Sequence, residues 1–146
     1  MLLFAIKDDR YAMPTERIVE IIPLVRFKKI PKTADHVAGM INYHGEPVPV
    51  IDLGVLIGGS PCDRYYSTRI ILVNYPLAQG EKLLGIMAER ATSMISNQEG
   101  QIDSGRILID EALHTSEAGG KNDGIVQWFD LVRMVPEGMV AELLRG

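Results

Sequence analysis

Short runs of β-forming residues, separated by turn signals roughly every eight to twelve residues, are the feature that most limits the possible folds of this chain. Residues 2–14 contain two such runs around Asp8 and Asp9, which predicts a β-hairpin. Residues 68–75 are apolar and β-branched enough for a buried strand. A clear helix is expected only at 136–145, where a proline opens the segment and apolar residues share one stripe. About eight to ten strands with so little helix predict a barrel or a sandwich.

Two prolines interrupt one of these runs, because the β-forming segment 41–53 carries Pro47 and Pro49. Proline cannot donate a hydrogen bond to a β-ladder, so it is excluded from a central strand. The segment therefore fits either an edge or bulged strand, or a strand that leaves one sheet and enters another.

The stretch from 24 to 40 mixes basic and turn-forming residues. Its four basic residues are Arg26, Lys28, Lys29 and Lys32. Lysines discourage edge-to-edge pairing, so this cluster favours a solvated strand edge over an RNA-binding surface. Residues 32–40 then look like one or two helical turns, with Thr33 or Asp35 as the cap and Gly39 at the end.

The composition describes a small soluble protein. The 146 residues fit one domain, or two very small lobes that share a core. The net charge of −4 argues against nucleic acid, since phosphate binding requires a basic face. The single cysteine, Cys62, excludes an internal disulfide and fits a reducing cytosol. No apolar run is long enough to span a membrane and no signal peptide is recognisable, so we expect a cytoplasmic protein.

The sequence offers no catalytic constellation and no metal site. The histidines His36, His44 and His114 lack metal-ligand spacing. His44 and Asp52 could act as a base and its orienting group, but eight residues of extended strand would separate them by roughly 25 Å. Because a buried carboxylate needs hydrogen bonds, Asp52 is expected to accept bonds from backbone N–H groups. A binding or adaptor role is therefore favoured; the alternative is a small β-barrel enzyme or ligand-binding domain that uses Asp52, His44 and Glu89.

Four segments resemble, in the same order, the motifs of CheW-like domains, the scaffold proteins of bacterial chemosensory arrays. The segment LLFAIKDDRYAMPTERIVEII resembles the opening F-x-hydrophobic, Tyr and V-x-E-I pattern. The segment HVAGMINYHGEPVPVIDL resembles the run of Gly, hydrophobic-Asn, R-G and P-V-hydrophobic-D-L. LLGIMAERATSMI resembles a G-hydrophobic-x-V-D-x-V strand pair, and GIVQWFDLVRMV the closing strand. The likeness covers residues 2–97 well and 124–144 more weakly.

The resemblance implies an all-β fold and a function without catalysis. The fold would be two small SH3-like five-stranded barrels packed against each other, with a third apolar core between them and a short C-terminal helix. The whole chain, 1–146, would form one such domain, with the strand 47–53 near the junction of the lobes. The protein would bridge the cytoplasmic tip of a methyl-accepting chemoreceptor and the regulatory domain of a CheA-type histidine kinase, without a cofactor. An adaptor with two partners should also expose apolar side chains on each lobe.

The resemblance also implies a receptor-binding groove and two departures from the family pattern. The groove residues would be Ile18, Glu20, Gly39, His44 and Met94, with His44 exposed beside Gly39 and Glu20. The family usually has arginine at the position of His44, and V-D where this chain has Ala88 and Glu89. Arginine carries a permanent charge and a forked donor whereas histidine is mostly neutral near pH 7, so receptor binding should be weakened or tuned to an unusual receptor. Three segments are similar to the CheW-like adaptors of Wsp-type surface-sensing pathways, in which the kinase controls a diguanylate cyclase. These segments are STRIILVNYP, LGIMAERAT and GIVQWFDL.

Overall fold

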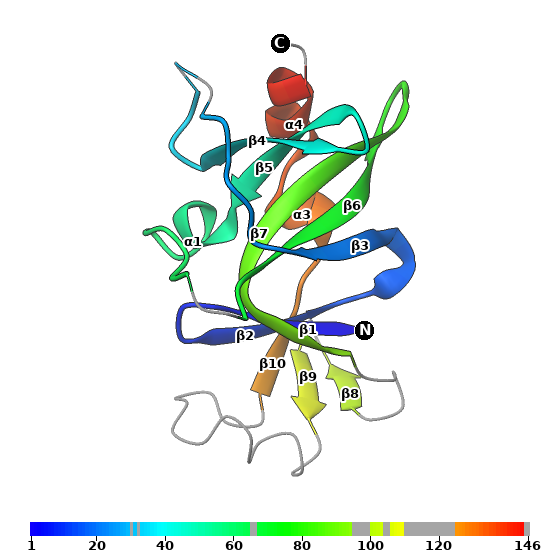
Figure 1. Cartoon of the computed structure of the whole chain (residues 1–146). Coiled ribbons are helices and arrows are strands. Elements are labelled where there is room, and N and C mark those ends of the chain that lie inside the picture. The colour runs from blue at the N-terminus through cyan, green and yellow to red at the C-terminus, as the bar shows by residue number, and fades with distance from the viewer. Residues whose placement is uncertain are drawn as a thin grey trace.

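The computed structural model of this chain describes residues 1–29, 31, 33–64, 67–94, 100–103, 106–109 and 125–144 (Figure 1). Over these residues it contains ten strands, which is within the expected range. The strands are β1 (Leu2–Ile6), β2 (Asp9–Met13), β3 (Ile18–Pro23), β4 (Val37–Tyr43), β5 (Glu46–Asp52), β6 (Arg69–Leu77), β7 (Gly80–Met94), β8 (Gly100–Asp103), β9 (Arg106–Ile109) and β10 (Ile125–Trp128). The helical segments are η1 (Thr15–Arg17), α1 (Leu53–Leu56), α3 (Leu131–Met134) and α4 (Glu137–Leu144). The predicted N-terminal hairpin and C-terminal helix are both confirmed.

Five strands form the first lobe, in the order β3-β6-β7-β5-β4. The pairs are antiparallel except β5 with β7, which is parallel. The sheet curls, and the segment that follows β3 runs back past β4 (Figure 1). A single backbone bridge between Lys28 and Met40 joins the segment after β3 to β4. This bridge closes the seam of the small barrel.

The second lobe takes the strands β7-β1-β2-β10-β9-β8 and shares β7 with the first. Residues of β7 up to Ala88 pair with β6, whereas Glu89 and the residues after it pair with β1. Arg90 has a φ of +51°, and the register with β1 shifts there, so a β-bulge turns the strand from one sheet into the other. The two-lobe all-β prediction is confirmed. The strand that passes between sheets is β7 and not the proline-containing segment.

The prolines of β5 lie in the half of that strand that has one partner. Pro47 and Pro49 pair with β4, and pairing with β7 begins only at Val50. The N–H of Met40, opposite Pro49, donates to Lys28 and not to β5, so the two prolines occupy non-hydrogen-bonded pairs of the β4–β5 ladder. Their missing N–H donors therefore interrupt no hydrogen bond to β4. The edge-strand explanation of the two prolines is correct, and the same strand ends at Asp52 beside the junction of the lobes.

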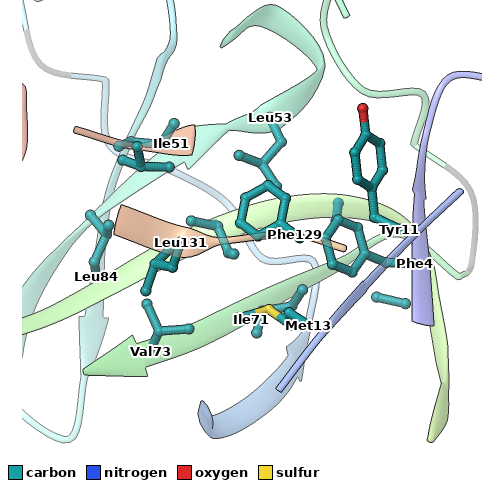
Figure 2. Close-up of a cluster of buried hydrophobic side chains, with 14 of the residues drawn as sticks. Phe4, Tyr11, Met13, Ile51, Leu53, Ile71, Val73, Leu84, Phe129 and Leu131 are labelled. Atoms are coloured by element: carbon teal, nitrogen blue, oxygen red, sulfur yellow. The ribbon is translucent and has the colours of Figure 1, made fainter. Parts of the chain in front are cut away.

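The described residues form three apolar clusters, and the largest of these lies between the lobes (Figure 2). Alternate residues of one strand serve different clusters: on β6, Ile71 and Val73 enter the central cluster while Ile70 and Leu72 enter the barrel of the first lobe. The central cluster combines aromatic and aliphatic side chains from both sheets and from the C-terminal segment, including Phe4, Tyr11, Ile51, Leu84, Phe129 and Leu131. The third core that the family resemblance implied is therefore present.

The expected helical turns before β4 are not formed. Asp35 lies in a turn, and β4 begins at Val37, so Gly39 lies inside a strand and does not end a helix. Its φ of +154° is one that other residues rarely adopt. A Cβ at this position would lie 2.7 Å from the Cβ of Phe27 and 2.8 Å from the carbonyl oxygen of Lys28. Glycine is needed here because the segment after β3 crosses β4 so closely.

Candidate protein-binding site

The hairpin between β4 and β5 presents His44 at its tip. His44 and Gly45 have φ values of +52° and +86°, which is the pattern of a two-residue type I′ turn. The Gly45 N–H donates to Asn42 Oδ1 at 2.8 Å and fixes this conformation. Histidine accepts the left-handed region more readily than most residues, so the turn holds the imidazole outward and exposed.

Tyr43 connects this hairpin to the opposite edge of the barrel. Its ring is half-buried against the core of the first lobe, and its hydroxyl donates a hydrogen bond to Glu20 Oε1 on β3. The hydrogen bond to Glu20 is the main reason why the pKa of Tyr43 is raised, with burial and the Glu20 charge adding to it. The ring of His44 meets that of Tyr43 edge to face, with centroids 4.4 Å apart. We call Glu20, Tyr43 and His44 the seam patch, because they lie across the gap between β3 and β4.

The other residues assigned to the receptor groove lie elsewhere. Ile18 packs against the central core, because a β-bulge between Ile18 and Glu20 breaks the alternation that would place both on one face. Gly39 is buried in β4 under the segment after β3. Met94 ends β7 and pairs through its backbone with Leu2 in the second lobe; its side chain lies outside the described residues. The structure thus joins Glu20 and His44, through a tyrosine that the sequence analysis did not single out.

Exposed apolar side chains occur near the seam patch and on the C-terminal segment. Val19, which precedes Glu20 in the chain, is 43% exposed, Val25 in the segment after β3 is 42% exposed, and Val132 on α3 is 39% exposed. In the second lobe, Trp128 is half-buried. These side chains are apolar surface that a docking partner could cover.

One of the basic residues between 26 and 32, Lys28, lies at the seam of the barrel. Arg26, Lys28 and Lys29 are exposed, and the backbone of Lys28 forms the bridge that closes the first lobe. Lys32 lies outside the described residues. The arrangement agrees with a solvated edge, which was the favoured interpretation of the cluster.

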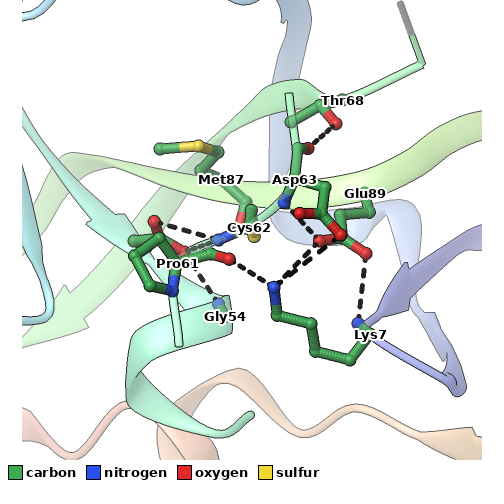
Figure 3. Close-up of polar contacts among 9 residues, drawn as sticks. Lys7, Gly54, Pro61, Cys62, Asp63, Thr68, Met87 and Glu89 are labelled. Atoms are coloured by element: carbon green, nitrogen blue, oxygen red, sulfur yellow. Dashed lines mark hydrogen bonds and ion pairs between the residues drawn. The ribbon is translucent and has the colours of Figure 1, made fainter. Parts of the chain in front are cut away.

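Asp52 is a structural acceptor, as expected. It is 6% exposed, and its Oδ1 accepts the N–H of Gly54 at 2.8 Å and that of Cys62 at 3.1 Å (Figure 3). The first bond caps α1, and the second fixes the connection that leads to β6. The Cys62 thiol donates to the carbonyl oxygen of Met87, and burial raises the pKa of this thiol.

Glu89 is a second buried carboxylate, at the point where β7 changes sheets. Its Oε2 accepts the N–H of Asp63 at 2.6 Å, and its Oε1 accepts the N–H of Lys7 at 3.2 Å. The Lys7 ammonium lies 3.8 Å from Glu89 and 3.9 Å from Asp63, and donates to the carbonyl oxygen of Pro61 (Figure 3). The network ties the β1–β2 turn of the second lobe to the 60–63 connection of the first. Sequence reasoning noted Glu89 as a departure from the family pattern and as a candidate residue of the alternative enzyme or ligand-binding domain, but not as a link between the lobes.

These contacts leave no catalytic arrangement around Asp52, His44 and Glu89. Both carboxylates are occupied by backbone N–H groups, and His44 lies in the turn before β5 whereas Asp52 ends that strand. Within the described part of the chain, no three His, Cys, Asp or Glu side chains cluster in a way that could hold a metal ion. His114 lies outside that part. Among the same residues, no helix has the length and apolar character that a membrane crossing requires.

Comparison with known proteins gives one consistent family. The family model described as the CheW-like domain matches residues 1–138. The chemotaxis protein CheW of Helicobacter pylori is 28% identical over 124 residues, which is 84% of this chain and 73% of that protein. The chemotaxis protein CheW of Thermotoga maritima is 24% identical over 143 residues, which is 97% of this chain and 91% of the relative.

A solved structure shows the same fold. The scaffolding protein TtCheW from Thermoanaerobacter tengcongensis superposes with a TM-score of 0.62 at 22% identity, over 89% of this chain and 82% of that one. The all-β, two-lobe architecture described above is consistent with this likeness. The family match includes the seam patch and the buried carboxylates, because it spans residues 1–138. The chain therefore belongs to the family of CheW-like domains, which are non-enzymatic scaffolds.

Proposed function

We propose that this protein is an adaptor that couples the cytoplasmic tip of a methyl-accepting chemoreceptor to the regulatory domain of a CheA-type histidine kinase. The observation that carries the proposal is the family match over residues 1–138. The adaptor acts in the cytoplasm and needs no cofactor. It binds both partners at once, so that the conformational state of the receptor shifts the equilibrium between the states of the kinase. A coupling free energy of about 1–3 kcal/mol is typical of such a link.

We propose further that the receptor binds across the seam of the first lobe. The resemblance assigns the receptor groove to Ile18, Glu20, Gly39, His44 and Met94. Two of these, Glu20 and His44, are exposed and belong to the seam patch, which supports them as direct contacts. Gly39 supports the groove indirectly, since its missing Cβ lets the segment after β3 cross β4.

The receptor contact is tested at His44, where this chain departs from the family. A fragment of the cytoplasmic tip of a chemoreceptor from the same genome is titrated against wild type, His44→Arg and His44→Ala. His44→Arg restores the forked donor and should tighten binding by roughly fivefold, the effect of one added hydrogen bond. His44→Ala should weaken receptor binding and leave both kinase binding and the unfolding temperature unchanged.

Two results would contradict these proposals separately. Equal affinities of the three proteins would place His44 outside the interface and remove the groove assignment. Failure of both a CheA-type kinase and a chemoreceptor to co-purify with the tagged protein from its own cells would refute the adaptor proposal itself.

A more specific proposal concerns the output of the signalling pathway. The likeness of residues 67–76, 84–92 and 124–131 to Wsp-type adaptors suggests a kinase that controls a diguanylate cyclase. Deletion of the gene should then change the cellular level of cyclic diguanylate on surface contact. A deletion that changes swimming behaviour and leaves cyclic diguanylate unaltered would assign the protein to a motility pathway.

A further inference from the structure

A backbone bridge and a hydrogen bond between side chains both span the seam of the first lobe. The backbone bridge between Lys28 and Met40 closes the seam on one side of β4. At the hairpin end of β4, the hydroxyl of Tyr43 donates to Glu20 across the gap. An exposed glutamate on an outer strand is thereby tied to the neighbouring edge of the barrel.

This contact restricts a side chain that would otherwise be mobile. A glutamate on the surface samples several rotamers, and fixing it in one of them costs conformational entropy. Tyr43 can fix it because its own ring is held against the core of the first lobe while its hydroxyl reaches the surface. A tyrosine hydroxyl is protonated at neutral pH, so it can donate to Glu20, and this hydrogen bond in turn raises the pKa of Tyr43. The Glu20 carboxylate is thus oriented before any partner arrives.

The oriented carboxylate has room for a second contact. Tyr43 occupies Oε1 of Glu20, and the side chain of Glu20 is exposed. An ionised carboxylate only accepts hydrogen bonds, so its complement is a donor, and a cationic donor gives the stronger bond. The aromatic ring of Tyr43 beside it also attracts a cation. We propose that Tyr43 is a positioning residue of the receptor site, which holds Glu20 ready to bind an arginine or lysine side chain of the receptor tip.

This inference rests on the proposed receptor binding, and a double-mutant cycle tests it. The probe is the same receptor-tip fragment, titrated against wild type, Tyr43→Phe, Glu20→Gln and the double variant at low and high salt. Phenylalanine keeps the ring in the core and removes only the hydroxyl. Glutamine keeps the shape and removes the charge. Tyr11→Phe is the matched control, because it removes a tyrosine hydroxyl in the second lobe.

The cycle has a defined pattern if Tyr43 acts through Glu20. Tyr43→Phe should weaken binding by about three- to tenfold, since the partner must then order the carboxylate itself. The same change made in the Glu20→Gln background should have little further effect. Wild-type affinity should fall with added salt more steeply than that of Glu20→Gln. Tyr11→Phe should bind like wild type.

Different outcomes would overturn the proposed receptor binding and the positioning role of Tyr43. If wild type does not bind the fragment, the proposed receptor binding falls and this inference falls with it. If wild type binds and Tyr43→Phe binds equally well, Tyr43 has no positioning role while the adaptor proposal stands. Equal effects of Tyr43→Phe in both backgrounds would show that the tyrosine acts independently of Glu20 and would also overturn the inference.

Discussion

Replacement of Glu89 by alanine should destabilise the whole domain. The change removes two hydrogen bonds from backbone N–H groups, those of Asp63 and Lys7, to a carboxylate that is 2% exposed. Bonds to a charged acceptor each contribute about 1.5–3 kcal/mol, and the ion pair with the partly exposed Lys7 contributes less than about 1 kcal/mol. The free energy of unfolding should therefore fall by about 3–5 kcal/mol, and the unfolding temperature by about 10–20 °C for a chain of this size.

Two variants control this measurement. Glu81→Ala removes a glutamate from the same strand, but this side chain is 59% exposed and lies 3.7 Å from Arg17 as a surface ion pair, so the loss should stay below about 1 kcal/mol. Glu89→Gln keeps one acceptor oxygen and turns an NH₂ group towards the other N–H, so its loss should be intermediate. The assay is urea unfolding followed by circular dichroism. Equal losses for Glu89→Ala and Glu81→Ala would refute the claim that the buried carboxylate holds the lobes together.

Three further changes test other parts of the structure. Gly39→Ala should cost about 1–3 kcal/mol in urea unfolding, because the new Cβ would lie 2.8 Å from the Lys28 carbonyl oxygen; Gly45→Ala, with open space around it, should cost less. Burial raises the pKa of the Tyr75 hydroxyl in the folded protein, so the contribution of this hydroxyl to the free energy of unfolding is complete below about pH 10. This contribution is lost as the pH rises through the folded-state pKa, so the stability advantage of wild type over Tyr75→Phe should shrink above about pH 10. Cys62, buried and with a raised pKa, should react with a thiol reagent only on unfolding, and rapid labelling of the native protein would contradict its placement.

Local patterns in the sequence predicted the elements whose causes are local. The β1–β2 hairpin follows from turn residues between two apolar runs, β6 from its unbroken apolar run, and α4 from a proline followed by an apolar stripe. Gly39 was misassigned because glycine marks both helix ends and close backbone approaches, and only the tertiary path of the segment after β3 distinguishes them. The sharing of β7 could not be predicted, since the turn between the sheets depends on a positive φ at Arg90, a residue with no special preference for it.

In the candidate site too, the sequence predicts roles that depend on local pattern but not contacts between distant segments. Asp52 is a lone carboxylate in an apolar alternation, so its need for backbone donors could be read from the sequence. The partners of Glu89 could not, because they come from segments 82 and 26 residues away along the chain. Tyr43 is likewise visible as a partner of Glu20 only after the barrel closes.

The sharing of β7 between the lobes also limits how such a domain can change over evolutionary time. The second lobe needs β1 and β2 from the beginning of the chain, half of β7 from its middle and β10 from near its end, while the first lobe is inserted between them and uses the other half of β7. No single crossover between two related genes can exchange one lobe and leave the other intact. The exchange of one lobe therefore requires two crossovers, one of them inside β7, so substitutions on the lobe surfaces are the simpler route to new partner specificity.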